Sequence, residues 1–296
     1  MNKNLDCDYI LRVTAANGYI RGFFATSKNV SNEAYKAHKT SPVVSVALSR
    51  LLTATAIIGQ TLKHDDHKIT LIFNGDGPMQ GILATSDSYG NVKGYPYVAN
   101  VDLPLKPSGN LDVGSAIGYG SMKIIKDIGL KDAYTGHIPL ISGEIADDLT
   151  YYYAKSEQIP TSVALSASVD TDYSIKCAGG FMIQVLPGAS DETIDIIENN
   201  LAHLPKLTKM LEEGQTPEDI ANHILGELNL KIHDKTPIKF ICDCSYEKVK
   251  QAFITIGKKD LIDIYENDKS AELNCHFCNK KYQFTEEDLK EIIDDL

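Results

Sequence analysis

Two close pairs of cysteines near the C-terminus constrain this chain more than any other feature. They are 30 residues apart and follow the pattern C-x-C, then C-x₂-C, at Cys242, Cys244, Cys275 and Cys278. Together the pairs offer four thiolates, the tetrahedral ligand set of a structural zinc ion. Spacing alone leaves open an iron–sulfur site, disulfides without metal, or coincidence. His276 lies inside the second pair and is a possible competing ligand, although four sulfurs already complete the zinc shell.

The first pair differs from the usual C-x₂₋₄-C zinc knuckle. A disulfide across C-x-C closes a small, strained ring, and strain makes a disulfide easier to reduce. The residues alone favour a permanent structural zinc and leave a redox switch open. The core of a segment the size of 238–296 supplies roughly 3–5 kcal/mol, whereas a structural zinc contributes about 10–16 kcal/mol. We therefore expect loss of the metal to unfold this segment and to loosen any helices that lean on it.

Charge and targeting signals narrow the class of protein. The chain has 296 residues and a net charge of −11, and 238–296 holds nine Lys against thirteen Asp and Glu, so we expect no nucleic-acid partner. The first residues lack the apolar run of a signal peptide, which predicts a cytoplasmic protein whose clustered cysteines are metal ligands or redox thiols. The apolar stretch 43–62 is as long as a membrane span but contains Arg50, so we expect a buried helix and no membrane association.

Hydrophobic patterning predicts an α+β fold in three parts. Segments 9–15 and 19–25 flank Asn17-Gly18 and predict a hairpin, and Ser41-Pro42 predicts the start of the apolar helix. Further strands are expected at 69–73, 80–84, 92–98, 122–126, 137–141, 163–169 and 181–186, and a helix capped by Ser142 at 144–153. The pattern is helical from 190 to 230 and includes a Thr216-Pro217 helix start.

These elements define the expected domains. They are a large α+β core domain at 1–188, a helical linker at 189–237, and a small α+β zinc-binding domain at 238–296. In the last of these we expect a helix capped by Ser245, a helix at 261–266, a turn at Cys275–Cys278, a strand at 281–284 and a terminal helix started by Thr285.

Other candidate residues favour structural roles. Cys7 and Cys177 are far from each other in sequence and are expected to be buried thiols. The glycine-rich segment 75–81 precedes a predicted strand instead of a helix, which favours a hairpin turn over a phosphate loop. The three consecutive tyrosines 151–153 are expected to be packing residues. The sequence contains no G-x₄-G-K-[ST] motif, so nothing in it indicates ATP binding.

Several motifs together resemble one known family. They are Asn17-Gly18-Tyr19-Ile20-Arg21-Gly22, Gly75-Asp76-Gly77-Pro78, Tyr151-Tyr152-Tyr153-Ala154-Lys155-Ser156-Glu157-Gln158-Ile159-Pro160, Ala178-Gly179-Gly180-Phe181, Phe240-Ile241-Cys242-Asp243-Cys244-Ser245 and Cys275-His276-Phe277-Cys278-Asn279. Over essentially its whole length the chain resembles the 33 kDa chaperonin family, the redox-regulated heat-shock proteins of bacterial cytosols.

The resemblance implies an ATP-independent holdase chaperone, not an enzyme. The reduced, zinc-bound form would be an inactive monomer. Oxidative stress would join Cys242 to Cys244 and Cys275 to Cys278, release zinc, and unfold the linker and the C-terminal domain. The active form, typically a dimer, would hold unfolded client proteins. The core domain 1–188 would bind these substrates, and 238–296 would be the redox-switch domain. Two other readings remain: a zinc-ribbon interaction module, and a thiol oxidoreductase, which would need an accessible cysteine of low pKa.

Overall fold

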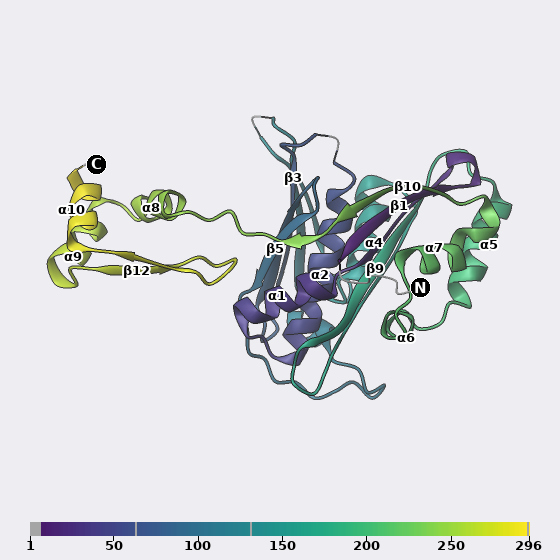
Figure 1. Ribbon diagram of the computed structural model, residues 1–296, viewed down its shortest axis with the longest axis horizontal. Coiled ribbons are helices and arrows are strands. Elements are labelled where there is room, and N and C mark those ends of the chain that lie inside the picture. The colour runs from purple at the N-terminus through teal and green to yellow at the C-terminus, as the bar shows by residue number, and fades with distance from the viewer. Residues whose placement is uncertain (1–6, 63, 131, 295) are drawn as a thin grey trace. The chain divides into compact units, whose positions relative to one another are not determined.

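The protein is described by a computed structural model that covers residues 7–62, 64–130, 132–294 and 296 (Figure 1). The chain divides into two compact units, Met1–Ile241 and Cys242–Leu296, called here the N-terminal and C-terminal units. Both contain helices and strands, which confirms the predicted α+β class. The finer boundaries expected at 188/189 and 237/238 stay predictions.

The first sheet of the N-terminal unit, sheet A, has five antiparallel strands. In spatial order they are β10 (Lys231–Pro237), β1 (Tyr9–Ala15), β2 (Ile20–Thr26), β9 (Ile175–Val185) and β8 (Thr161–Val169). The predicted hairpin is β1–β2, and its short connection η1 (Ala16–Gly18) places Asn17 at φ 57° and Gly18 at φ 95°. Asparagine and glycine tolerate this left-handed backbone, which explains why the pair marks the turn.

The second sheet, sheet B, has six strands. In spatial order they are β11 (Lys239–Phe240), β5 (Asn91–Pro96), β4 (Gly81–Asp87), β3 (Lys68–Gly75), β6 (Gly120–Asp127) and β7 (Tyr134–Pro139). Only β11 runs parallel to its neighbour. The glycine-rich segment 75–81 connects β3 to β4, as predicted. A Cβ atom at Gly77 would lie 2.5 Å from the Ala116 carbonyl oxygen, so this close approach requires glycine.

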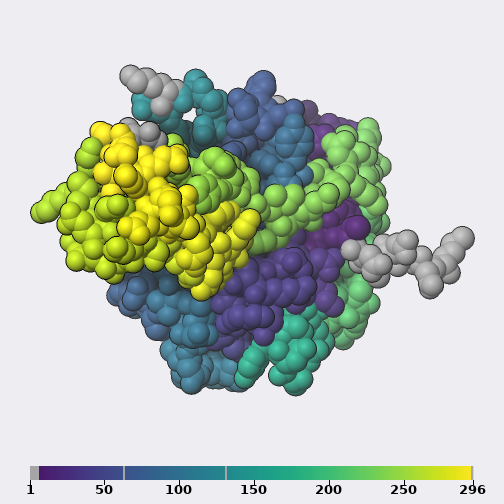
Figure 2. All heavy atoms as spheres, turned by 60° about the vertical axis from the view of Figure 1, so that its left-hand side comes forward, coloured from purple at the N-terminus to yellow at the C-terminus, as the bar shows by residue number. Residues whose placement is uncertain are grey.

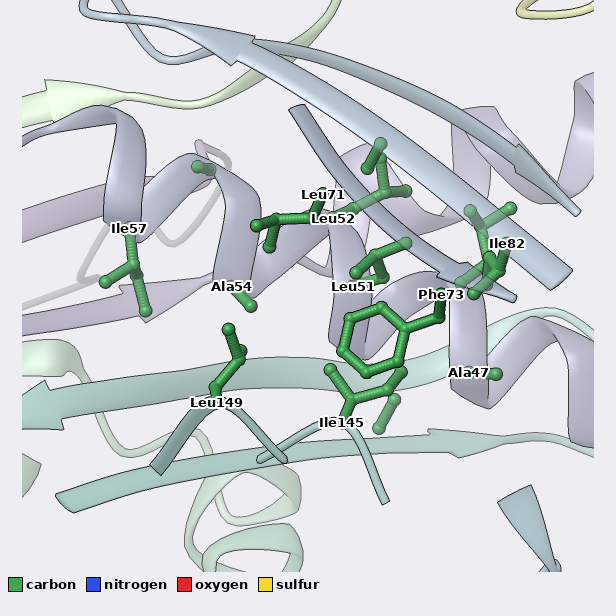
Figure 3. Close-up of a cluster of buried hydrophobic side chains, with 14 of the residues drawn as sticks. Ala47, Leu51, Leu52, Ala54, Ile57, Leu71, Phe73, Ile82, Ile145 and Leu149 are labelled. Atoms are coloured by element: carbon green, nitrogen blue, oxygen red, sulfur yellow. The ribbon is translucent and has the colours of Figure 1, made fainter. Parts of the chain in front are cut away.

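A helical layer fills the space between the sheets. Its helices are α1 (Lys28–His38), α2 (Pro42–Gly59), α3 (Val113–Ile117) and α4 (Ala146–Tyr152), the last continuing into the π-helical turn η2 (Tyr153–Glu157). Helix α2 packs against strands of both sheets, which explains why it is apolar on every side. Figure 3 shows its residues Leu51, Leu52 and Ile57 among Leu71, Phe73 and Ile82 of sheet B. Ile145, which directly precedes α4, and Leu149 of α4 lie in the same cluster.

The length and hydropathy of α2 would suit a membrane span, but 89% of its apolar window is buried inside the unit. Arg50 of this helix pairs with Glu144 at 2.6 Å. Helix α2 is therefore a buried core helix of this unit, as predicted from the presence of Arg50 in the apolar stretch.

Several local predictions were wrong in detail. Ser142 does not cap α4; its hydroxyl accepts from the Glu144 amide, and the helix begins only at Ala146. Ser41 stands at the N-cap of α2 and Pro42 at its first position, as predicted, but the Ser41 hydroxyl bonds to the backbone of Val101 and not to a helix amide. Helices α1 and α3 and the strand β12 of the C-terminal unit were not predicted, because their apolar residues are few or their lengths short.

The predicted linker packs on the outer face of sheet A. It contains α5 (Asp191–Ala202), α6 (Leu207–Glu212), α7 (Pro217–Leu225) and η3 (Gly226–Leu228) before ending in β10. Thr216 caps the start of α7, as predicted, and the structure adds that Thr216 and Asp219 form a reciprocal capping box. Ile220, Ile224 and Leu225 are buried against the sheet. The helices therefore dock on the β-rich core, while the strand β10 was missed.

The C-terminal unit holds three helices and a hairpin among its described residues. They are α8 (Tyr246–Ile254), α9 (Lys258–Asn267), β12 (Ala271–Asn274), β13 (Lys281–Phe284) and α10 (Glu286–Asp294). Ser245 accepts from the Lys248 amide and caps α8, and Thr285 exchanges hydrogen bonds with Asp288 at the start of α10, both as predicted. Its buried apolar residues are Phe253, Leu261, Tyr282, Phe284, Leu289 and Ile292.

Candidate metal centre

Two short loops of the C-terminal unit present the four cysteines. The first pair lies just before α8, whose capped N-terminus fixes the direction of the chain after Cys244. The second pair lies in the turn between β12 and β13. That turn is closed by hydrogen bonds from the Asn279 amide to the Cys275 carbonyl (2.8 Å) and from the Cys275 amide to the Lys280 carbonyl (3.0 Å). Asn279 adopts φ 56°, a left-handed conformation that asparagine tolerates.

The fold brings the four thiols into one cluster. All four sulfur atoms lie within 4.8 Å of one another, with Cys242 and Cys275 at 3.6 Å and Cys244 and Cys278 at 3.5 Å. Sulfurs about 2.3 Å from a tetrahedral zinc ion lie about 3.8 Å apart. The donor set and its spacing therefore fit a zinc ion. Such a tetrahedron makes all sulfur pairs nearly equidistant, so these distances do not select a disulfide pairing.

His276 does not belong to this cluster. Among the described residues, the group that can hold a metal ion consists of the four cysteines alone.

The surroundings act differently on the individual thiols. Burial raises the pKa of Cys242 and of Cys278. Burial also acts to raise the pKa of Cys244, but hydrogen bonds from Tyr282 and from the neighbouring thiols outweigh it and lower that pKa to about 7. The Tyr282 hydroxyl donates to the Cys244 sulfur over 3.1 Å. A metal-bound thiolate would accept the same hydrogen bond, which holds the ligand in place.

Tyr282 is the site residue that sequence reasoning missed. It lies on β13, opposite Leu273 of β12, and its ring is buried in the small core. The sequence signal was the strand pattern 281–284 directly after the second cysteine pair, which alternates exposed and buried residues. Only the fold shows that the tyrosine hydroxyl reaches the first pair.

Of the two remaining cysteines, one agrees with the prediction of a buried thiol and one does not. Cys177 is buried as predicted, and burial raises the pKa of its thiol, which contacts the Ser168 hydroxyl at 3.2 Å. Cys7 is exposed, because it precedes β1 and lies outside the sheet. Although far apart in sequence, the two residues line one cavity of about 260 Å³ beside α6.

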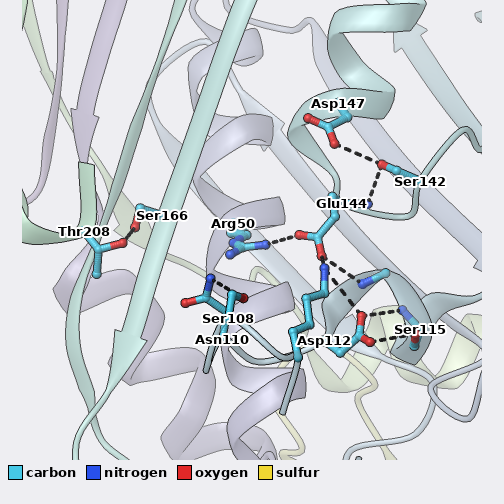
Figure 4. A network of polar contacts seen from close by, with 12 residues as sticks. Arg50, Ser108, Asn110, Asp112, Ser115, Ser142, Glu144, Asp147, Ser166 and Thr208 are labelled. Atoms are coloured by element: carbon cyan, nitrogen blue, oxygen red, sulfur yellow. Dashed lines mark hydrogen bonds and ion pairs between the residues drawn. The ribbon is translucent and has the colours of Figure 1, made fainter. Parts of the chain in front are cut away.

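A separate cavity of about 350 Å³ lies beside a network of paired charges in the N-terminal unit. Glu144 bonds to both Arg50 and Lys106, and Asp112 accepts from the Ser115 amide and hydroxyl (Figure 4). The positive partners lower the pKa of Glu144 against the effect of burial. The charges neutralise one another, which is typical of a structural network that ties α2 to the loop before α4.

The three consecutive tyrosines are packing residues, as expected. Tyr152 and Tyr153 are buried, and Tyr151 is partly buried against the main core. The Tyr152 hydroxyl donates to Glu157 at 2.6 Å, and Glu157 also pairs with Lys126 of β6. The motif thus anchors the π-helical turn to sheet B.

Comparisons with known proteins agree along nearly the whole chain. The family model described as Hsp33 protein matches residues 8–285. The chain is 48% identical over 286 residues to the 33 kDa chaperonin of Lachnoclostridium phytofermentans, covering 97% of this chain and 98% of that protein. It is 49% identical over 290 residues to the 33 kDa chaperonin of Clostridioides difficile, with 98% and 99% covered.

A solved structure shows the same fold. The 33 kDa chaperonin (heat shock protein 33 homolog) from Thermotoga maritima superimposes with a TM-score of 0.91 at 35% sequence identity, covering 97% of this chain and 98% of that one. The chain therefore belongs to the Hsp33 family, and its function is that of a molecular chaperone.

Proposed function

We propose that this protein is a redox-regulated, ATP-independent holdase of the cytoplasm. In its reduced state the four cysteines bind one zinc ion and the protein is an inactive monomer. Oxidation forms two disulfides, releases zinc, and unfolds the C-terminal unit and the linker 189–237. The activated protein forms a homodimer that binds unfolding client proteins and prevents their aggregation.

The cluster of four sulfurs within 4.8 Å carries this proposal. The described part of the C-terminal unit has a core of only six buried apolar residues. A core of this size supplies roughly 3–5 kcal/mol, against the roughly 10–16 kcal/mol of a structural zinc. The folding of the unit therefore depends on its metal, and the metal depends on four reduced sulfurs.

Peroxide supplies the oxidant in a balanced step. Four zinc-bound thiolates and two molecules of hydrogen peroxide, with four protons, give two disulfides, free Zn²⁺ and four waters. Each disulfide releases two electrons, which cleave one O–O bond. Pairing Cys242 with Cys244 and Cys275 with Cys278 follows the family. It places one disulfide in the strained C-x-C ring, which cellular thiols reduce readily.

The linker is the second part of the proposed switch. Its helices bury Ile220, Ile224 and Leu225 against sheet A, where Leu11 and Phe24 form the opposing apolar surface. Release of these helices would expose apolar area on both the linker and the sheet. Exposed apolar area is what a holdase offers to a partly unfolded protein.

One experiment on the full chain tests the sequence of events. The zinc-loaded, reduced protein is treated with hydrogen peroxide at mild heat. Zinc release is followed with a chromophoric chelator, and unfolding by far-UV circular dichroism. Light scattering of a heat-denatured client, without ATP, measures the chaperone activity. Zinc release, loss of helix and suppressed aggregation should appear together.

A matched variant separates the cluster from the other thiols. Cys177→Ser removes a buried thiol that lies outside the cluster and should respond to peroxide as the unchanged protein does. Client aggregation that is unaffected by the oxidised protein would refute the holdase function. Activity that rises without zinc release would refute the proposed switch.

A further inference from the structure

The last strand of the linker covers an edge of sheet A. Strand β10 pairs antiparallel with β1, from Tyr9 opposite Pro237 to Thr14 opposite Lys231, with a register shift after Arg12. It is the outermost strand of the sheet, and β1 has β2 on its other side. In the space-filling view the green chain before the C-terminal unit runs along the purple N-terminal strands (Figure 2).

Side-chain contacts hold β10 only weakly. Six of its seven residues are exposed, including Ile232, so the strand buries little apolar surface. Its contacts are at the surface: Asp234 pairs with Arg12 where both side chains are half exposed, and His233 bonds to Thr14 at 2.7 Å. Exposed pairs of this kind contribute about 0–1 kcal/mol each. Main-chain hydrogen bonds therefore provide most of the attachment.

The neighbouring strand β1 differs from β10 because most of its side chains are buried. In β1, Leu11, Val13 and Ala15 are buried under the linker helices, whereas Ile10 faces the main core. Lys235 of β10 pairs with Glu218 in the first turn of α7, so the strand and the helices are tied together. Removal of the linker would leave β1 with an unpaired backbone edge directly beside an apolar face.

We propose that this edge of β1 is a strand-addition site for extended segments of unfolding clients, and that β10 occupies it in the inactive protein. The inference rests on the proposed function, because the linker must be released first. The seated β10 shows that the site accepts an extended antiparallel chain. A client strand in its place would direct alternate side chains over the face of Leu11 and Val13, so apolar residues at every second position would bind best.

The pairing register of β1 with β10 identifies the amides whose hydrogen exchange reports whether the site is occupied. The Ile238 amide donates to the Asp8 carbonyl, so Asp8 faces β10 with its backbone groups. Because the direction alternates along a strand, Ile10 and Arg12 also face β10, while Leu11 and Val13 face β2. Pro237, which has no N–H group, stands opposite Tyr9, a position at which β10 donates no hydrogen bond to β1. The strand β1 thus contains both reporter amides and internal controls.

Amide hydrogen exchange of the full chain, resolved by residue, tests the proposal. The probe is reduced, carboxymethylated lactalbumin, a permanently unfolded protein. Oxidation should deprotect β10 and the amides of Ile10 and Arg12. Addition of the probe should slow the exchange of these two amides again by about tenfold or more, while β10 stays unprotected. Leu11 and Val13 should stay protected throughout.

Each other outcome has a defined meaning. If the probe binds and Ile10 and Arg12 stay unprotected, clients use the apolar face alone and strand addition is wrong. If these amides become protected without probe and in proportion to protein concentration, a second copy of the chain occupies the edge and the client site is refuted. If oxidation neither frees β10 nor produces binding, the proposed function itself fails.

A pair of proline variants tests the role of β10 independently. Thr236→Pro removes an amide that faces Ile10, whereas Lys235→Pro replaces a residue opposite Leu11 whose amide faces away. In the reduced, zinc-bound protein, Thr236→Pro should speed exchange at Ile10 and Arg12 about tenfold more than Lys235→Pro does. After oxidation both variants should bind the probe as the unchanged protein does. Weaker binding by Thr236→Pro alone would place the client contact on β10 and overturn the proposal.

Discussion

The two units of this protein differ in the size of their hydrophobic cores and in their content of clustered thiols. In the N-terminal unit, α2 lies between two sheets, and large side chains such as Phe23, Phe73 and Tyr152 are completely buried. The C-terminal unit has six buried apolar residues in its described part and a cluster of four thiols. Hydrophobic burial is insensitive to oxidants, whereas thiolate coordination is destroyed by them. Under the proposed function, the N-terminal unit would stay folded while the C-terminal unit responds to redox conditions.

Metal removal should produce the largest difference in stability between the two units. Chelation of the reduced protein removes an interaction of about 10–16 kcal/mol from the C-terminal unit and none from the N-terminal unit. We expect limited proteolysis to cleave within 242–296 while the core from β1 to β9 stays intact. The same chelator saturated with zinc is the control. Equal protease resistance of residues 242–296 with and without metal would break the comparison.

Two matched core substitutions come next in expected size. Phe73→Ala and Phe284→Ala each remove a fully buried ring, and each should cost about 3–5 kcal/mol. In the N-terminal unit this lowers the free energy of unfolding at any zinc concentration. In the C-terminal unit it cancels most of what the small core supplies, so the stability of Phe284→Ala should depend steeply on free zinc. Denaturant melts at several buffered zinc concentrations measure both; zinc-independent melting of Phe284→Ala would contradict the expectation.

Loss of one sulfur should weaken zinc binding without changing the large core. Cys278→Ser should lower zinc affinity by about 100-fold or more, since even the loss of an outer-shell partner costs about 10–100-fold. Cys177→Ser is the matched control and should bind zinc normally, because its thiol contacts Ser168 and lies outside the cluster. Competition with a chromophoric chelator gives both affinities. Unchanged zinc affinity in Cys278→Ser would exclude this residue as a ligand.

Lowering the pH should stabilise the N-terminal unit and weaken zinc binding in the C-terminal unit. The smallest of the expected effects is the change in stability caused by Asp8 in the N-terminal unit. Burial raises the pKa of Asp8 to about 6 from an ordinary value of 3.8, although its carboxylate accepts from the Val30 amide. Its folded pKa lies above the unfolded one, so its stabilisation is complete below pH 3.8 and is lost as pH rises through 6. Relative to Asp8→Asn, the N-terminal unit should lose about 2–3 kcal/mol between pH 4 and 6.5. Denaturant melts at each pH measure this difference, and a flat difference would contradict it.

Protons act on the zinc centre with the opposite sign. They compete with zinc for the thiolates, so zinc affinity should fall as the pH is lowered. A chelator titration over the same pH range measures it in the C-terminal unit.

Local sequence signals were sufficient at several turns and helix starts, although not at Ser142. The Asn17-Gly18 turn, the cap at Thr216 and the cap at Ser245 formed as predicted, because each satisfies its own backbone groups. The apolar α2 was recognisable for the same reason, since Arg50 and its length exclude most alternatives. Strand β10 was missed because nearly all of its side chains are exposed. Its sequence therefore lacks the alternation of apolar and polar residues that marks a half-buried strand.

The sequence by itself determined which four cysteines offer a tetrahedral set of sulfur donors, because cysteine chemistry and pair spacing are local properties. The tertiary structure decided which distant groups meet. It places Tyr282 on the Cys244 sulfur, lays the linker helices on sheet A, and closes that sheet with β10. These contacts join residues far apart in the chain, and they depend on the burial and register of whole elements, which no short segment encodes.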